Sequence, residues 1–173
     1  MVTPDTAQLL TGYLAWANRV MFDAIAALPE GEAVKERISL FKTMVLSMNH
    51  NYVVDLIWQA HIEGRGHGIA ALNTVIHAEL EPLRQAQAKI DAWYANWAAG
   101  LTAAQWYEEL DFTLIGGNRG RMNRGAVLMH VVNHTTYHRG FVADMFFQVP
   151  QRPPTTDLPV YMRHLAEKQS AVA

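Results

Sequence analysis

The sequence predicts an all-α protein, a bundle of four long helices with a short hairpin inserted before the fourth. Apolar residues recur at the three- and four-residue spacing of amphipathic helices through most of the chain. The main clusters of glycine and proline fall between these stretches. The sequence does not alternate predicted strands with helices, so a parallel sheet is not expected. With 173 residues, 50% hydrophobic and 17% charged, the chain is expected to form a single domain over residues 1–173.

The first two helices are predicted from their end signals and their apolar spacing. Thr3 followed by Pro4 is typical of a helix start, and the apolar periodicity that follows ends at the Pro-Glu-Gly sequence of residues 29–31. Ser39 is predicted to cap a second helix, which ends at Gly64. This second stretch is apolar over most of its circumference, as expected for a helix buried among others.

A glycine-rich connector leads to the third predicted helix, from about residue 79 to 99, with Pro82 tolerated in its first turn. Thr102 and Gln105 have the spacing of a capping box, which predicts a short helix ending near residue 110.

The stretch 111–123 (DFTLIGGNRGRMN) differs, because two short segments flank Gly-Gly-Asn as in a β-hairpin. Asn123 is predicted to cap the fourth long helix, from about residue 125 to 148. Prolines at 150, 153 and 154 prevent that helix from continuing. A small final helix is expected from about residue 157 to 168.

Composition excludes several classes of function. A formal net charge of -2 and a pI of about 6.4 provide no field that would attract a polyanion, so no nucleic-acid partner is expected. No continuous apolar block suggests a signal peptide or a membrane span, and a cytoplasmic location without membrane association is expected. The absence of cysteine excludes disulfides, cysteine-ligated zinc and a cysteine nucleophile.

Three histidines recur at intervals of four in the sequence HVVNHTTYHRG of residues 130–140. On a regular helix, His134 and His138 lie in the middle of the apolar stripe, within about 40° of one line. His130 lies about 60° from that line and about 12 Å along the axis from His138, so one ion cannot easily bind both. Geometry allows His130 with His134, or His134 with His138, and the stripe favours the second pair.

A metal ion would explain two imidazoles on a core face, because a buried ring needs partners for its nitrogens. The alternative is that each histidine bonds a core carbonyl or carboxylate. His50 is the best candidate for a third ligand, since it lies in mid-helix beside apolar neighbours. Asp55 is expected either to orient a ligand ring or to be an exposed or capping carboxylate.

Three neutral imidazoles leave coordination positions open, as in catalytic rather than structural metal sites. Such an ion lowers the pKa of a bound water or thiol, and nickel or zinc suits nitrogen ligands. Arg119, Arg121 and Arg124 could receive an anionic group, although a solvated hairpin turn is the favoured interpretation. Arg139 is expected to be a structural ion pair or a pocket residue.

The sequences SMNHNYVVDLIW and VVNHTTYHRG, with the opening YLAWANRVMFDAIAALP and the closing DLPVYMRHL, resemble the DinB family over nearly the whole chain. The most specific part is a histidine followed by an aspartate five residues later and a tryptophan three beyond, together with the distant HxxxHRG. Carried over to this sequence, the family's metal triad falls on His50, His134 and His138.

The resemblance implies an up-down-down-up bundle, commonly a homodimer, with a divalent metal, often nickel or zinc, that faces a pocket. Relatives include thiol-dependent transferases and isomerases that use low-molecular-weight thiols, and metal hydrolases. It therefore implies a metal-dependent enzyme acting on a small-molecule substrate, or a module that binds metal or ligand without catalysis. Phe141 stands where the family often has glutamine, which makes the expected pocket more apolar.

Overall fold

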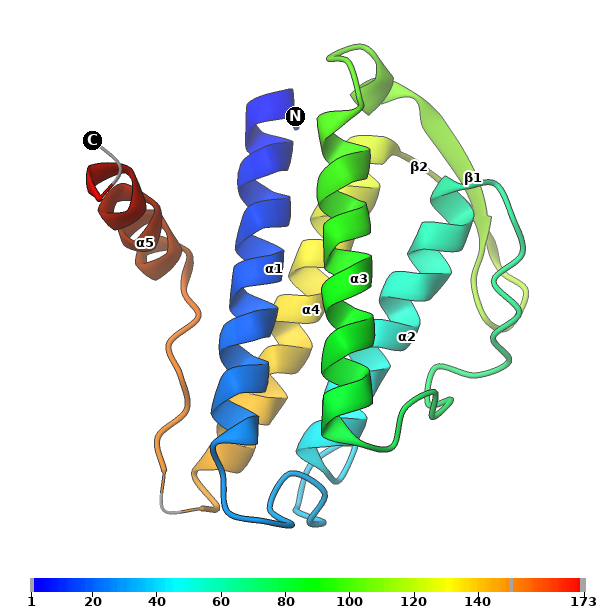
Figure 1. Ribbon diagram of the computed structural model, residues 1–173. Helices are drawn as coiled ribbons and strands as arrows, with labels where there is room; N and C mark the ends of the chain where they lie inside the picture. Colours follow the sequence, from blue (N-terminus) through cyan, green and yellow to red (C-terminus); the bar gives the residue numbers. More distant parts are fainter. Residues whose placement is uncertain (1, 150, 172–173) are drawn as a thin grey trace.

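The computed structural model describes residues 2–149 and 151–171, and its main body is a bundle of four long helices (Figure 1). These helices are α1 (Pro4–Ala26), α2 (Met44–Ile62), α3 (Leu80–Ala99) and α4 (Arg124–Phe146). In Figure 1, α1 and α4 run in one direction and α2 and α3 in the other, while α5 (Leu158–Ser170) lies outside the bundle beside α1. The mainly helical fold class is confirmed.

The predicted starts of α1 and α4 are confirmed by the hydrogen bonds of their capping residues. Thr3 Oγ1 accepts a hydrogen bond from the backbone N–H of Thr6 at 3.2 Å. Asn123 Oδ1 accepts one from the N–H of Ala126 at 2.8 Å. Each cap satisfies a backbone donor that has no partner within the helix. Pro150, one of the residues expected to end α4, lies outside the described residues. In the part of the chain that is described, none of the helices is long and apolar enough to cross a membrane.

The predicted start of the second helix at Ser39 is wrong. Lys42 adopts a φ of +64°, a left-handed conformation that interrupts a right-handed helix. The helix begins at Met44 instead, and Thr43 Oγ1 caps it by accepting a hydrogen bond from the N–H of Leu46 at 3.0 Å. Residues 27–43 therefore form a loop, and Phe41 lies on this loop and not on the second helix.

The hairpin comprises β1 (Glu109–Thr113) and β2 (Arg119–Asn123), which pair antiparallel. Phe112 lies opposite Gly120, and its ring covers that glycine so closely that a Cβ there would clash. The short helix predicted to end near residue 110 is reduced to one 3₁₀ turn, Gln105–Tyr107, because the strand already begins at Glu109.

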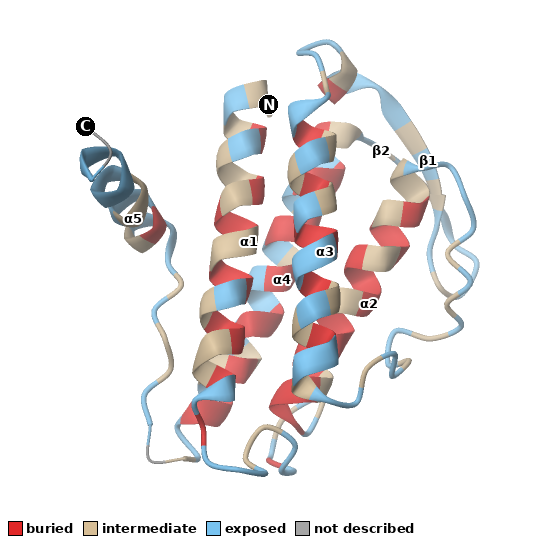
Figure 2. Cartoon of the chain, in the orientation of Figure 1, coloured by how far each residue is buried: buried red, intermediate tan, exposed pale blue. Residues whose placement is uncertain are grey.

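The apolar core runs along the centre of the bundle, where the buried positions face inward (Figure 2). One apolar cluster gathers near the α1 C-terminus and includes Met21, Met48, Leu83 and Val142. A second includes Leu14, Val54, Ile90 and Val131. A third cluster joins α1, α4 and α5. Gly12 allows α5 to approach α1 closely, since a Cβ at Gly12 would clash with the Tyr161 hydroxyl.

A layer of buried polar residues crosses the bundle between the first two clusters. Along each long helix, these polar residues come between residues of the first cluster and residues of the second. We call this set the polar layer: Asn18 of α1, Asp55 of α2, Gln87 and Asp91 of α3, and Thr135 and Arg139 of α4.

Hydrogen bonds connect the polar layer from helix to helix. Gln87 Nε2 donates to Asp55 Oδ2 at 2.8 Å and to Asp91 Oδ1 at 2.9 Å. Asn18 Nδ2 donates to Asp91 Oδ1 at 3.0 Å, and Asn18 Oδ1 accepts from Arg139 Nη1 at 3.1 Å. Buried charged groups are stable only with such partners, so the layer fixes the register of all four helices.

The core makes a matched prediction for two neighbouring residues of α4. Leu128 is fully buried and Met129 is exposed. We expect Leu128→Ala to lower the free energy of unfolding by about 2–5 kcal/mol, because it leaves a cavity in the core. Met129→Ala should change it by less than about 0.5 kcal/mol. Chemical denaturation of both variants measures the difference. Equal losses of unfolding free energy would contradict the finding that Leu128 faces the core and Met129 faces solvent.

Candidate metal centre

The structure brings together His50, His134 and His138, the three histidines expected from the sequence. His50 comes from the middle of α2, and the other two lie one turn apart on α4, which packs against α2. One donor nitrogen from each ring lies within 4.8 Å of the other two. Within residues 2–149 and 151–171, this is the one group of three or more metal-ligating side chains that meets this criterion.

The surroundings of the three rings fit a metal ion. His50 Nδ1 lies 2.9 Å from the Leu72 carbonyl oxygen, and donation of an N–H to that carbonyl leaves the Nε2 lone pair for a metal. The Nδ1 atoms of His134 and His138 are buried and have no hydrogen-bond partner among the residues that the structure describes. Such unpaired atoms cost free energy, and a bound cation would provide the triad with compensating interactions.

Burial keeps the imidazoles neutral. Burial, with smaller contributions from the neighbouring His138, His50 and His130, lowers the pKa of His134 to about 3. Burial, with a smaller contribution from His50, lowers the pKa of His138 to about 4. The pKa of His50 is lowered by burial, against the opposing effect of its hydrogen bond to Leu72. At neutral pH all three rings are therefore in the form that binds metals.

The position of the triad on α4 differs from the predicted one. The sequence placed His134 and His138 in the middle of the core-facing stripe; His138 is buried, as predicted, but His134 is only half-buried. Thr135 and Arg139, members of the polar layer, are completely buried. The buried face of α4 is thus turned toward these polar residues, and His134 lies at its edge.

His130 lies outside the triad, one turn before His134. Its ring centroid is 5.7 Å from that of His134 and 4.8 Å from that of Trp58, and burial lowers its pKa. His61 lies in the last turn of α2 and packs on Trp58 and on the connector residue His67. These positions agree with the expectation that a metal would not bind His130 together with His138.

Neither role expected for Asp55 is correct. Its carboxylate is completely buried and accepts a hydrogen bond from Gln87, not from a ligand ring. Burial raises the pKa of Asp55 well above its ordinary value, and the nearby Asp91 raises it further. Arg139 is a structural residue, since it donates to Asn18 and, at 3.1 Å, to the Tyr13 hydroxyl.

The arginines of the hairpin are mostly paired with carboxylates. Arg121 Nε lies 2.7 Å from Asp111 Oδ1, and Arg124 Nη1 lies 2.8 Å from Glu108 Oε2. Arg119 and Arg121 line a cleft of about 840 Å³ between the hairpin and the glycine-rich connector, together with His61. The ion pairs favour the solvated-hairpin interpretation for two of the three arginines.

Sequence reasoning missed three residues that contact the triad: Leu72, Phe41 and Tyr137, whose ring lies 5.0 Å from that of His138. Leu72 acts through its backbone carbonyl, which no side-chain pattern identifies. Phe41 stacks on His50 with ring centroids 4.3 Å apart, and it was missed because the loop that carries it was predicted as helix. The polar members of α1 and α3 were missed too; the available signal was a polar residue at a core position of an apolar helix.

The polar layer makes a prediction about its two carboxylates. Burial raises the pKa of both carboxyls, and we expect Asp55 to be the protonated member, because Asp91 accepts hydrogen bonds from both Asn18 and Gln87 whereas Asp55 accepts a short one from Gln87. At about pH 7.5, Asp55→Asn should therefore change the free energy of unfolding by about 1 kcal/mol or less. Asp91→Asn should lower it by about 1–3 kcal/mol, since its new amide would face the donors of Asn18 and Gln87. Urea denaturation measures both; a larger loss for Asp55→Asn would contradict the assignment.

Comparison with known proteins identifies the family of the chain. The model of the DinB family matches residues 1–169. Protein DinB of Bacillus subtilis (strain 168) is 26% identical over 162 residues, which cover 91% of this chain and 94% of that protein. The matched range runs from α1 into α5, and the positions of the three histidines fall within it. The chain belongs to the DinB family.

Proposed function

We propose that this protein binds one divalent metal ion through His50, His134 and His138 and uses it to activate water or a thiol for attack on a small electrophile. The observation that carries the proposal is the convergence of three donor nitrogens within 4.8 Å of one another. Burial lowers the pKa of each of these imidazoles, so they do not have to lose protons before binding at neutral pH.

The bound ion would lower the pKa of a water or thiol at an open coordination position. The residues of the chain would hold the ion and arrange its histidine ligands. The Leu72 carbonyl orients the ring of His50, and α4 sets the separation of His134 and His138. With no cysteine in the chain, an activated thiol would come from outside, as a low-molecular-weight thiol. Nickel and zinc are the metals proposed, since both suit imidazole ligands.

A second candidate function is a module that binds a metal or a small ligand without catalysis. The low exposure of His50 and His138 favours it, because a covered ion is poorly placed for turnover. Assays of the metal-loaded protein for thiol transfer and hydrolysis distinguish the two: turnover that disappears on metal removal supports the enzyme.

Other parts of the proposal rest mainly on the sequence. We propose the family's up-down-down-up order for the four long helices, which their directions in Figure 1 support. We also propose that the protein forms a homodimer, is located in the cytoplasm, and acts on a small molecule rather than on a nucleic acid.

Elemental analysis of untagged protein tests metal binding. We expect about one divalent ion per chain and at least about a hundredfold weaker metal binding in His134→Ala, because loss of a ligand exceeds the 10–100-fold effect of losing a residue that merely orients one. His130→Ala is the matched control, one turn away on the same helix, and should change affinity by less than about tenfold. Metal-free wild-type protein, or an unchanged metal content in His134→Ala, would contradict the proposal.

Metal retention should persist at unusually low pH. Protons compete with the metal for the same nitrogens, and an ordinary imidazole is half protonated at about pH 6.5. The pKa of His134 is about 3, that of His138 is about 4, and that of His50 is lowered too, so the decline in affinity should begin at a pH below about 6.5. Chelator competition at each pH measures this dependence. A steep decline that begins near pH 6.5 would show that the ligands titrate as ordinary imidazoles.

A further inference from the structure

Aromatic rings from outside the triad enclose one side of the metal centre. The ring of Phe41 lies nearly parallel to that of His50, with centroids 4.3 Å apart, and meets His138 at 5.5 Å. On α4, Tyr137 and Phe141 lie 5.0 and 5.6 Å from the ring of His138 and 5.1 Å from each other. Three aromatic side chains, from a loop and from α4, thus contact the same ligand.

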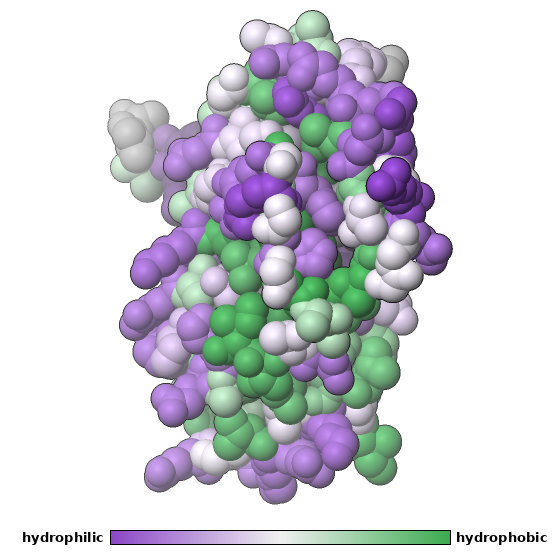
Figure 3. Space-filling view, turned by 90° about the vertical axis from the view of Figure 1, so that its right-hand side faces the viewer, coloured by the Kyte–Doolittle hydropathy of each residue, from purple (hydrophilic) through white to green (hydrophobic). Residues whose placement is uncertain are grey.

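These rings lie at the surface and not in the core. Tyr137 is exposed, while Phe41 and Phe141 are half-buried. The loop that carries Phe41 also presents Ile38 and Leu40, which are 94% and 65% exposed. In Figure 3, which views the side of α2 and the connector, hydrophobic side chains gather over the lower half of the face. Apolar surface gathered around a site, rather than scattered singly, is typical of ligand binding.

Charged groups of this loop are paired with one another. Lys35 and Arg37 both pair with Glu32, and Lys42 Nζ lies 3.7 Å from Glu36 Oε1. With Glu30, residues 27–43 carry three positive and three negative side chains, so the loop has no net charge. Apolar contact is therefore the main interaction that this loop offers to a ligand.

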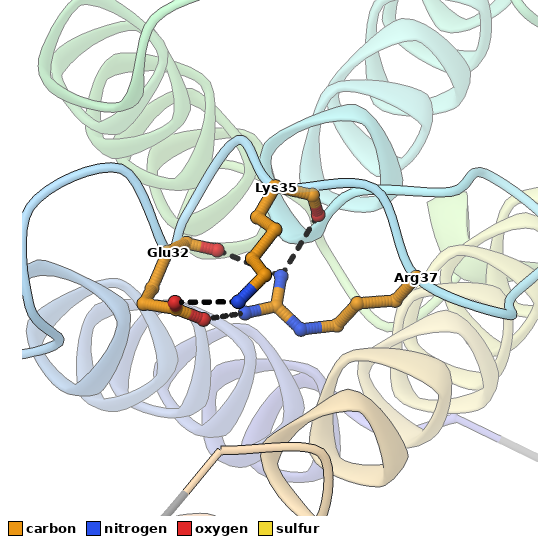
Figure 4. A network of polar contacts seen from close by, with 3 residues as sticks. All are labelled: Glu32, Lys35 and Arg37. Carbon is orange, nitrogen blue, oxygen red and sulfur yellow. Dashed lines mark hydrogen bonds and ion pairs between the residues drawn. The ribbon is translucent and has the colours of Figure 1, made fainter.

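The loop holds Phe41 in a fixed position. Arg37 is buried, and its Nη1 donates to the carbonyls of Glu32 at 2.7 Å and Lys35 at 2.9 Å (Figure 4). Its backbone N–H donates to the carbonyl of Lys42 at 2.7 Å. Lys42 adopts the left-handed φ of +64°, which persists in a non-glycine residue only where the surroundings enforce it, as at ligand-binding segments. Because Phe41 is already held in place, a ligand can bind against its ring without a further loss of conformational entropy in the loop.

We infer that the substrate of the metal centre is a neutral molecule with an apolar, preferably aromatic, body, and that Phe41 is the residue that recognises it. The body would contact Phe41, Tyr137 and Phe141 while the reacting group reaches the metal. This inference rests on the proposed function, because it concerns the ligand of the open coordination position.

Cobalt-loaded protein tests the inference through three ligands that share one donor group. Imidazole, 4-phenylimidazole and imidazole-4-acetate bind a metal through the same ring nitrogen and differ in what that ring carries, and the visible absorption of cobalt reports binding. We expect 4-phenylimidazole to bind at least about tenfold more tightly than imidazole. Imidazole-4-acetate should bind no more tightly than imidazole.

Variants of phenylalanine assign the effect to one residue. Phe41→Ala should reduce the advantage of 4-phenylimidazole over imidazole, measured as the ratio of their affinities for the same variant, to less than about threefold. Phe41→Leu, which keeps an apolar side chain, should retain part of the advantage. Phe147→Ala is the matched control, because Phe147 is 74% exposed and lies outside these contacts; it should leave all three affinities unchanged.

The outcomes separate the inference from the proposed function. Equal binding of imidazole and 4-phenylimidazole, tighter binding of imidazole-4-acetate, or an unchanged advantage in both Phe41 variants would overturn the inference alone. If the protein holds cobalt but binds none of the three ligands, the open coordination position is wrong, and the proposed function and the inference are both overturned.

Discussion

Burying the Arg139 guanidinium with the Asp55 and Asp91 carboxyls inside an apolar bundle is the constraint on which the structure depends. Each group needs hydrogen-bond partners where water is excluded, and Asn18 of α1 and Gln87 of α3 provide them. Sliding any long helix by one turn would break these contacts. The alignment that satisfies the polar layer is the same one that places His50 opposite the two histidines of α4.

The two sides of α4 separate charged groups from the candidate metal ligands. His134 precedes Thr135, and His138 precedes Arg139, so each histidine is about 100° around the helix from a member of the polar layer. On one side, the carboxyls and the guanidinium bond to amides and hydroxyls. On the other side, the imidazoles of the triad meet aromatic rings and one backbone carbonyl. Asp55 therefore does not bond to a ligand ring, and the triad stays neutral beside a charged core.

The sequence predicted the features that local patterns encode. Caps at Thr3 and Asn123 and apolar spacing located α1 and α4, and helical rotation paired His134 with His138. It failed at Ser39, because the left-handed Lys42 and the hydrogen bonds of Arg37 depend on contacts within the loop. It also placed His134 in the middle of the buried face of α4, since the predicted stripe left out Thr135 and Arg139, which are buried there. Their burial becomes predictable only once partners on other helices are known, and the Leu72 carbonyl carries no side-chain signal at all.

The ligands of the metal centre lie on helices, whereas Phe41 lies on a loop outside α2. A change in a helix residue of the polar layer disturbs four elements at once. By contrast, residues 38–41 lie on a loop, where substitutions are better tolerated, and they reach the triad through the ring of Phe41. Selection can therefore alter what approaches the metal while the machinery that holds it stays intact. Such a division would let one helical frame diversify in substrate preference among homologous proteins without each new specificity requiring a new fold.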